Sequence, residues 1–250
     1  MYLASLKQTV RLYPYVLLVV VMTILEALFP EEQVVIGLAM VVLLFVLQYE
    51  AFSQCLPTDV RIPVPVFNKV VGFVFRFVIL SIISSIPPFL LFLLFIGAIQ
   101  VFPESLALLG TWTGKIVGSL LFVAFSILSY CYVLAKLGLI LPAGIAGYDS
   151  TLSTAMDRSM GKVRLIVFRL LSGPVLLFIA PFFLSFFGLM ISSLAGLDGA
   201  EGEMSLWLSV PVAVLSTGFI CWGEVMIAVI LSNLFLEVRT ITPGSTLKTT

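Results

Sequence analysis

One acidic residue lies where an apolar environment is expected. Glu224 is in the middle of the apolar segment 206–236, with Trp207 near one end of the segment and Arg239 just after the other. These flanking residues predict a position near the middle of a membrane, where a charged side chain is costly and marks a candidate functional site. We therefore expect a neutral, protonated carboxyl, which could relay protons or bind a cationic or hydroxyl ligand.

A structural role for Glu224 is the alternative. A protonated carboxyl can donate one hydrogen bond to a neighbouring helix. Polar side chains within the apolar segments offer acceptors, for instance Ser126, Ser129, Tyr130 or Thr217. We favour this structural interpretation and keep the ligand or proton site as the second one.

Basic side chains form a second group of candidates near the ends of the apolar segments. Arg76 and Arg169 each follow a lysine by seven residues, roughly 10 Å along a helix. An arginine at that depth can extend its guanidinium to the headgroups. Glu50 and Glu237 lie near enough to pair with some of the basic residues. We interpret five basic residues as charges at the cytoplasmic interface: Arg76, Lys136, Arg158, Lys162 and Arg169.

The residue types in the sequence give little support for a catalytic or metal-binding site. The chain has no histidine, which removes the usual general base and the commonest metal ligand. Cys55, Cys131 and Cys221 are far apart, so we expect neither a disulfide nor a metal site. An enzyme acting on lipids would have to use Asp149, Asp157 or Ser159, and this is the least favoured interpretation. We predict no catalytic residue and no cofactor.

The elements that must position these residues are membrane helices. Hydrophobic residues make up 61% of the 250 residues and charged residues 10%, far from the composition of a soluble domain. One span needs roughly 20 apolar residues. The sequence predicts an all-α polytopic bundle forming a single integral membrane domain over 1–250, with about six spans, near 13–29, 34–54, 70–101, 113–141, 163–195 and 206–236.

The basic residues predict the orientation of this bundle. Lys and Arg fall before the first span, between spans two and three, between four and five, and after six, whereas the opposite connections carry mainly Glu and Asp. By the positive-inside rule both termini are cytoplasmic. The net charge is zero, so we expect the lipid bilayer as the main partner, with other membrane subunits or a second copy as further candidates, and no nucleic acid.

Two finer features are predicted around the connection between spans four and five. The segment from Pro142 to Gly147 should end span four, and Asp149 and Ser150 should cap a short amphipathic helix lying in the interface, with an ordinary polar loop as the alternative. A parallel internal repeat is also predicted, because 69–141 aligns with 162–234 and eight of the first 21 positions are identical.

The region 134–164 resembles a known family pattern. Lys136 precedes a short apolar stretch and Pro142, and Ala155 and Ser159 follow in the interfacial helix. This order, with the ending Ser232 to Arg239, is similar to the YciC-like bacterial inner-membrane family, which is related to the membrane domain of glycerophosphoryl diester phosphodiesterases. The resemblance implies a six-span protein of the bacterial inner membrane with a part in envelope maintenance. Phosphodiesterase activity is not implied, because the soluble domain that performs it is absent here.

These observations predict a non-enzymatic membrane protein, acting as a scaffold or accessory subunit through helix and lipid contacts. The alternative is a transporter or channel component that uses Glu224. The two functions differ in whether solute or protons cross the membrane.

Overall fold

The computed structural model describes residues 1–60, 66–101, 112–148, 150–194 and 206–241, and every regular element within these ranges is a helix. The predicted all-α fold is confirmed. The two 3-10 turns are η1 (Pro30–Glu32) and η2 (Thr58–Val60). The α-helices are α1 (Tyr2–Arg11), α2 (Tyr13–Leu28), α3 (Gln33–Cys55), α4 (Val66–Val101), α6 (Trp112–Leu137), α7 (Ile140–Ala146), α8 (Leu152–Ser159), α9 (Val163–Leu171), α10 (Pro174–Leu194) and α11 (Leu206–Ile241).

The apolar helices have the length that a membrane requires. Among the described residues, five are long and apolar enough to cross a bilayer, and there are six if α1 and α2 together form one bent span. In hydrocarbon every backbone N–H and C=O must be satisfied within the protein, which a helix does along its own length. The chain is therefore a multi-pass membrane protein with a helical bundle fold.

Two of the predicted spans consist of two helices each. Span five is interrupted between α9 and α10, where Pro174 occupies the first turn of α10 and cannot donate a backbone hydrogen bond. Span four is interrupted after Leu137, and α7 then continues through Pro142 to Ala146. The segment from Pro142 to Gly147 ends this span, as predicted. The helix ends at Gly147, whose φ of 83° favours glycine.

The short helix predicted between spans four and five is α8. The capping residue is Thr151, whose Oγ1 accepts a hydrogen bond from the backbone N–H of Thr154 at 3.3 Å. The expected cap at Ser150 is therefore wrong, and Asp149 lies outside the described residues. Ala155 and Ser159 are buried on one side of α8. Leu152 and Met156 lie beside them on the same face but are exposed, so the small residues of this face pack against the protein and the larger apolar ones are left uncovered.

The helix α1 is an element that we did not predict. It meets α2 at an angle of 78° instead of continuing along it. Its inward face is polar and buries Ser5 and Gln8, while Leu3, Leu6 and Val10 are exposed. Exposed apolar side chains spaced by three and four residues lie on one side of a helix. Such a surface suits a helix lying along the membrane interface.

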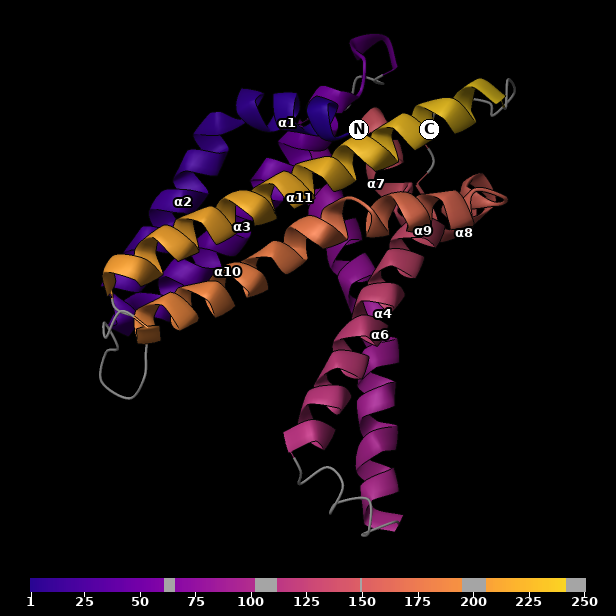
Figure 1. Ribbon diagram of the computed structural model, residues 1–250. Helices are drawn as coiled ribbons and strands as arrows, with labels where there is room; N and C mark the ends of the chain where they lie inside the picture. Colours follow the sequence, from indigo (N-terminus) through magenta and orange to yellow (C-terminus); the bar gives the residue numbers. More distant parts are fainter. Residues whose placement is uncertain (61–65, 102–111, 149, 195–205, 242–250) are drawn as a thin grey trace. The chain divides into compact units, whose positions relative to one another are not determined.

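The chain, which we treated as one domain, divides into two compact units. Unit 1 comprises residues 1–63 and 168–250, and unit 2 comprises residues 64–167. In unit 1, α11 packs against α1, α2, α3 and α10, as Figure 1 shows. In unit 2, α4 packs against α6 and α7, and α8 packs against α6. The helix α11 is therefore the central helix of unit 1.

The two halves of the predicted repeat each form a helical hairpin. The helices α4 and α6 pack against each other in the first half, and α10 and α11 do so in the second. The halves differ in continuity, since α4 is unbroken and its counterpart is divided into α9 and α10. The internal repeat stays a prediction.

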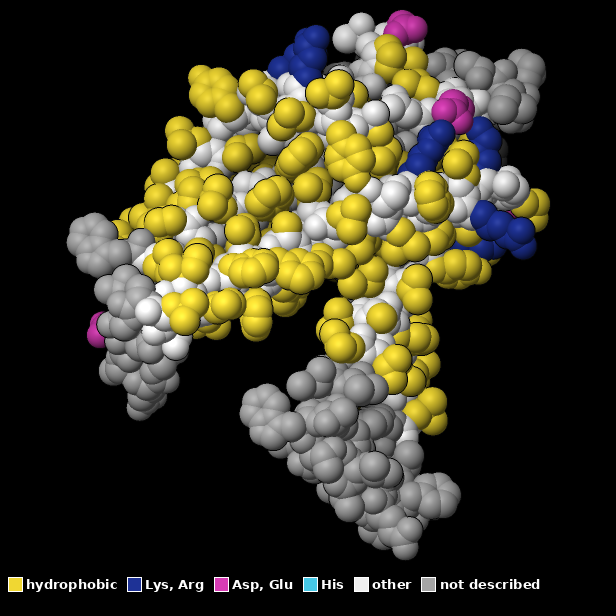
Figure 2. Space-filling model, viewed as in Figure 1, with side chains coloured by type: hydrophobic (Ala, Val, Ile, Leu, Met, Phe, Trp, Pro, Cys, Tyr) yellow, Lys and Arg dark blue, Asp and Glu magenta, His cyan; other side chains and the backbone are white. Residues whose placement is uncertain are grey.

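The surface of unit 1 is apolar over α10 and α11 (Figure 2). Large side chains of α10 are exposed, among them Phe182, Phe183, Phe186 and Leu194. Figure 2 shows an almost continuous layer of hydrophobic side chains over the visible face of α10 and α11. Exposed apolar area of this extent needs an apolar surrounding such as lipid.

Candidate functional site

Glu224 lies on α11 at the place where this helix enters the core of unit 1. The residues that follow it, from Val225 to Leu231, are all buried. The carboxylate Oε2 accepts a hydrogen bond from the amide Nε2 of Gln48 on α3. Gln48 is itself buried, seven residues or roughly 10 Å before the end of α3. Glu224 therefore faces packed helices and joins α11 to α3.

The Gln48 amide can accept a hydrogen bond that it does not make among the described residues. Its Oε1 atom is buried and has no hydrogen-bond partner among the described residues. A protonated Glu224 can donate, and a carboxyl and an amide set face to face can exchange two hydrogen bonds. The amide orientation of a glutamine is assigned from such networks. Gln48 and Glu224 can therefore exchange two hydrogen bonds only when the Glu224 carboxyl is neutral.

Further polar pairs connect the same helices. The hydroxyls of Thr23 on α2 and Thr217 on α11 are 2.9 Å apart. The indole Nε1 of Trp222 donates to Ser5 Oγ at 2.9 Å. The Gln8 amide Nε2 on α1 donates to Gln54 Oε1 on α3 at 2.7 Å. Each pair bridges α1 or α11 to another helix, which explains why α1 turns its polar face inward.

The partner of Glu224 is Gln48, which was not among the four side chains that we named as examples. Thr217 is paired with Thr23, and Ser129 in unit 2 donates to the backbone oxygen of Ser84 at 3.2 Å. Ser126 donates to the backbone oxygen of Phe122 in its own helix. The missed partner left a signal, since Gln48 is an amide within the apolar span 34–54. Hydropathy alone does not say which helix faces α11.

Glycines permit close approaches in both units. A Cβ atom added at Gly223 would lie 2.7 Å from Cε1 of Phe178 on α10. At Gly144 on α7, it would lie 2.7 Å from Cζ of Arg76. A side chain larger than that of glycine would therefore disturb the packing at these two positions. Gly218 has nothing within 4 Å of such an atom, so no close contact requires a glycine there.

The five predicted interface charges have different surroundings. In unit 2, the guanidinium of Arg76 lies against α7 at Gly144, and the Lys136 ammonium is 5.9 Å from the centre of the Tyr132 ring. Arg158 is at the end of α8 and Lys162 immediately precedes α9. In unit 1, Arg169 borders a hollow described below. Arg76 therefore packs against protein instead of only reaching toward the headgroups.

Of the three residues considered for catalysis, the structure describes Asp157 and Ser159, and their surroundings differ. Ser159 is fully buried, and its Oγ donates to the backbone oxygens of Lys136 at 3.0 Å and Met156 at 2.9 Å. Asp157 is exposed on α8. No cluster of three or more His, Cys, Asp or Glu among the described residues could hold a metal ion, and the three cysteines are free. The hydroxyl of Ser159 thus anchors α8 to the end of α6.

The fold and these contacts define the class of protein as a polytopic helical membrane protein with a hydrogen-bonded core. No protein-family model, curated protein or solved structure matches the chain.

Proposed function

We propose that the protein is a non-enzymatic membrane protein that acts as a scaffold or accessory subunit. The main support is the bond between Gln48 and Glu224, because the most plausible intramembrane reactive group is committed to helix association. The pairs Thr23–Thr217 and Trp222–Ser5 use their polar atoms in the same way. Polar side chains that link helices in this manner stabilise membrane bundles.

The proposed location is the bacterial inner membrane, with a part in envelope maintenance. This follows from the YciC-like resemblance of segment 134–164. The proposed orientation has both termini in the cytoplasm, because Lys and Arg collect on that side of the spans. The exposed apolar sides of α1 and α8 fit helices that lie in the cytoplasmic interface.

The orientation predicts a labelling pattern. In a cysteine-free background, single cysteines at the exposed positions Ala4, Gln33 and Ser153 should differ in their reaction with an impermeant maleimide. In spheroplasts only Gln33→Cys should be labelled, and permeabilisation should expose the other two. A carboxyl-terminal fluorescent fusion should report the cytoplasm. Labelling of Ala4→Cys from outside, or a periplasmic carboxyl terminus, would contradict the orientation.

The alternative is a transporter or channel component in which Glu224 carries protons. The observation that keeps this alternative open is the Gln48 Oε1 atom beside Glu224, which has no hydrogen-bond partner in the described part of the chain. Purified protein in liposomes should show proton and potassium flux equal to that of empty liposomes, both for the wild type and for Glu224→Gln. Glutamine preserves the pairing with Gln48 and removes only the titrating group.

The control for this flux measurement is Glu50→Gln. Glu50 is on α3 in the same unit, and among the described residues it has no hydrogen-bond partner. Wild-type flux above background that falls in Glu224→Gln and persists in Glu50→Gln would overturn the scaffold proposal in favour of transport.

A further inference from the structure

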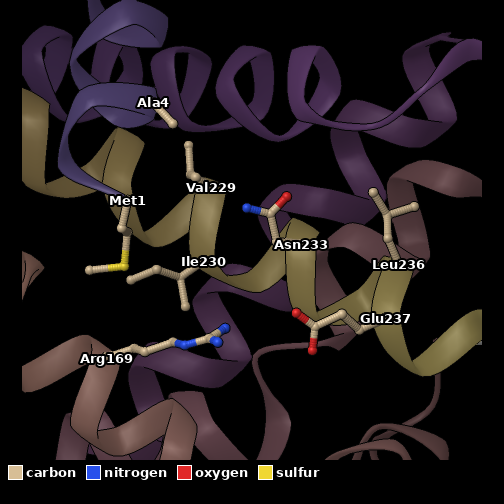
Figure 3. A pocket seen from close by; sticks show the side chains of 8 residues that line it. All are labelled: Met1, Ala4, Arg169, Val229, Ile230, Asn233, Leu236 and Glu237. Carbon is tan, nitrogen blue, oxygen red and sulfur yellow. The ribbon is translucent and has the colours of Figure 1, made fainter.

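A hollow of about 650 Å³ lies in unit 1 between α1, the end of α9 and the last third of α11. This size falls within the range of small-molecule sites, about 300–1,000 Å³. Figure 3 shows its lining side chains, which are Met1, Ala4, Arg169, Val229, Ile230, Asn233, Leu236 and Glu237. Glu224 is not among them, so this hollow is separate from the pair with Gln48.

The polar groups of the hollow have opposite charges. The guanidinium of Arg169 and the carboxylate of Glu237 point into it from opposite sides, with the Asn233 amide above them (Figure 3). Arg169 is half-buried, while Asn233 and Glu237 are exposed. A guanidinium binds a phosphate through two parallel hydrogen bonds. A carboxylate repels an anion but accepts bonds from an ammonium, and its several acceptor sites leave room for a ligand beside protein neighbours.

The remaining wall of the hollow is apolar. Val229 and Ile230 are almost fully buried and form part of the lining, together with Leu236 and Met1. A ligand complementary to this lining has a phosphate for Arg169, a nearby ammonium for Glu237 and an apolar part for the remaining side chains. A simple anion would meet the Glu237 carboxylate, and a simple cation would meet Arg169. The combination selects a zwitterion.

We propose that this hollow binds the phosphoethanolamine group of a phospholipid. The phosphate lies at Arg169, the ammonium lies at Glu237, and the glycerol and upper acyl chains lie along Val229 and Ile230. This inference rests on the proposed function, because Arg169 and Glu237 must lie at the cytoplasmic headgroup level. Basic side chains in pockets between membrane helices on that side bind the phosphates of lipid headgroups. The site would give a scaffold a preference for membranes rich in this lipid.

The test is competitive lipid binding by the purified full-length chain. The protein is exposed to equal amounts of phosphatidylethanolamine and phosphatidylglycerol with identical acyl chains, and native mass spectrometry measures the lipids retained. The wild type should retain phosphatidylethanolamine about tenfold more than phosphatidylglycerol. Arg169→Gln should lower the retention of both lipids about tenfold, because both present a phosphate.

Glu237→Gln distinguishes recognition from a structural effect. It should abolish the preference between the two lipids without lowering total retention, because the neutral amide no longer attracts the ammonium. Arg11→Gln is the matched control, since Arg11 is an exposed arginine of the same unit outside the hollow, and it should leave the ratio unchanged. An equal ratio in the wild type, or the same ratio in wild type and Glu237→Gln, would overturn the proposal. Glu237→Gln also carries the test if Arg169→Gln does not fold.

Soluble phosphoethanolamine separates a membrane lipid from a free metabolite as the source of the group. Displacement of phosphatidylethanolamine by the soluble compound at equal concentration would identify the free zwitterion as sufficient. Displacement only by the diacyl lipid would assign the apolar wall to acyl chains. This measurement is independent of ion flux, so transport activity would contradict the proposed function without changing the lipid ratio.

Discussion

Gly223→Ala should destabilise unit 1, whereas Gly218→Ala should leave it equally or more stable. The new methyl group at position 223 would lie 2.7 Å from Cε1 and 3.0 Å from Cζ of Phe178, so the ring or the helix must move. Overpacking of this kind costs about 1–3 kcal/mol. At position 218 nothing lies within 4 Å, and alanine favours the helix by up to about 1 kcal/mol.

A thiol-reactive fluorophore can measure this difference during heating in detergent. Cys221 is fully buried on α11 and reports the opening of unit 1, provided that Cys131 and Cys55 are replaced by serine. The double variant Gly223→Ala with Phe178→Leu should recover most of the lost stability, because leucine removes the ring atoms that the methyl group meets. Equal shifts of Tm for Gly218→Ala and Gly223→Ala would show that the approach of Phe178 does not limit the packing.

Gln48→Leu should lower the stability of unit 1 because it leaves the partly buried Glu224 carboxyl without its hydrogen-bond partner on α3. Loss of one partner of a buried hydrogen bond costs about 1–3 kcal/mol. Polar pairs in membrane bundles average nearer 0.6 kcal/mol. The lower end of the first range is therefore expected. Glu224→Leu should have a similar cost, since it leaves the Gln48 amide unpaired.

The double variant of Gln48→Leu and Glu224→Leu should be more stable than the sum of the single effects predicts. Both unpaired groups are then removed together, and the excess measures the coupling between them. Glu224→Gln should keep near wild-type stability, because an amide can donate to Gln48 Oε1, which has no partner among the described residues. Additive effects in the Leu series would contradict the bond between α3 and α11.

The sequence by itself determined the spans. Segments 13–29 and 34–54 correspond closely to α2 (Tyr13–Leu28) and α3 (Gln33–Cys55). The segment 206–236 lies within α11, which continues to Ile241. Such agreement is expected because the hydrophobic requirement and the backbone requirement of a membrane both act locally along the chain. A run of apolar residues therefore predicts a spanning helix without knowledge of its neighbours.

Local turns were predicted less well. The segment from Pro142 to Gly147 ends span four as expected, but the short separate helix α7, which includes Pro142, was not expected. The Pro142 ring removes one donor that an early helix position does not use. The basic residues that we placed before the first span, Lys7 and Arg11, belong to the helix α1, which was not predicted. The spacing of Leu3, Leu6 and Val10 was a signal for that helix, but it is short and its inward face is polar.

Only the tertiary structure decided which side chains meet. Glu224 and Gln48 are 176 positions apart, and hydropathy is nearly uniform around both helices, so no periodic signal indicates which face of α11 turns toward α3. The same applies to Phe178 on Gly223 and to the opposed charges of Arg169 and Glu237. Lipid makes all apolar faces nearly equivalent, and close packing together with a few polar pairs sets how the helices associate.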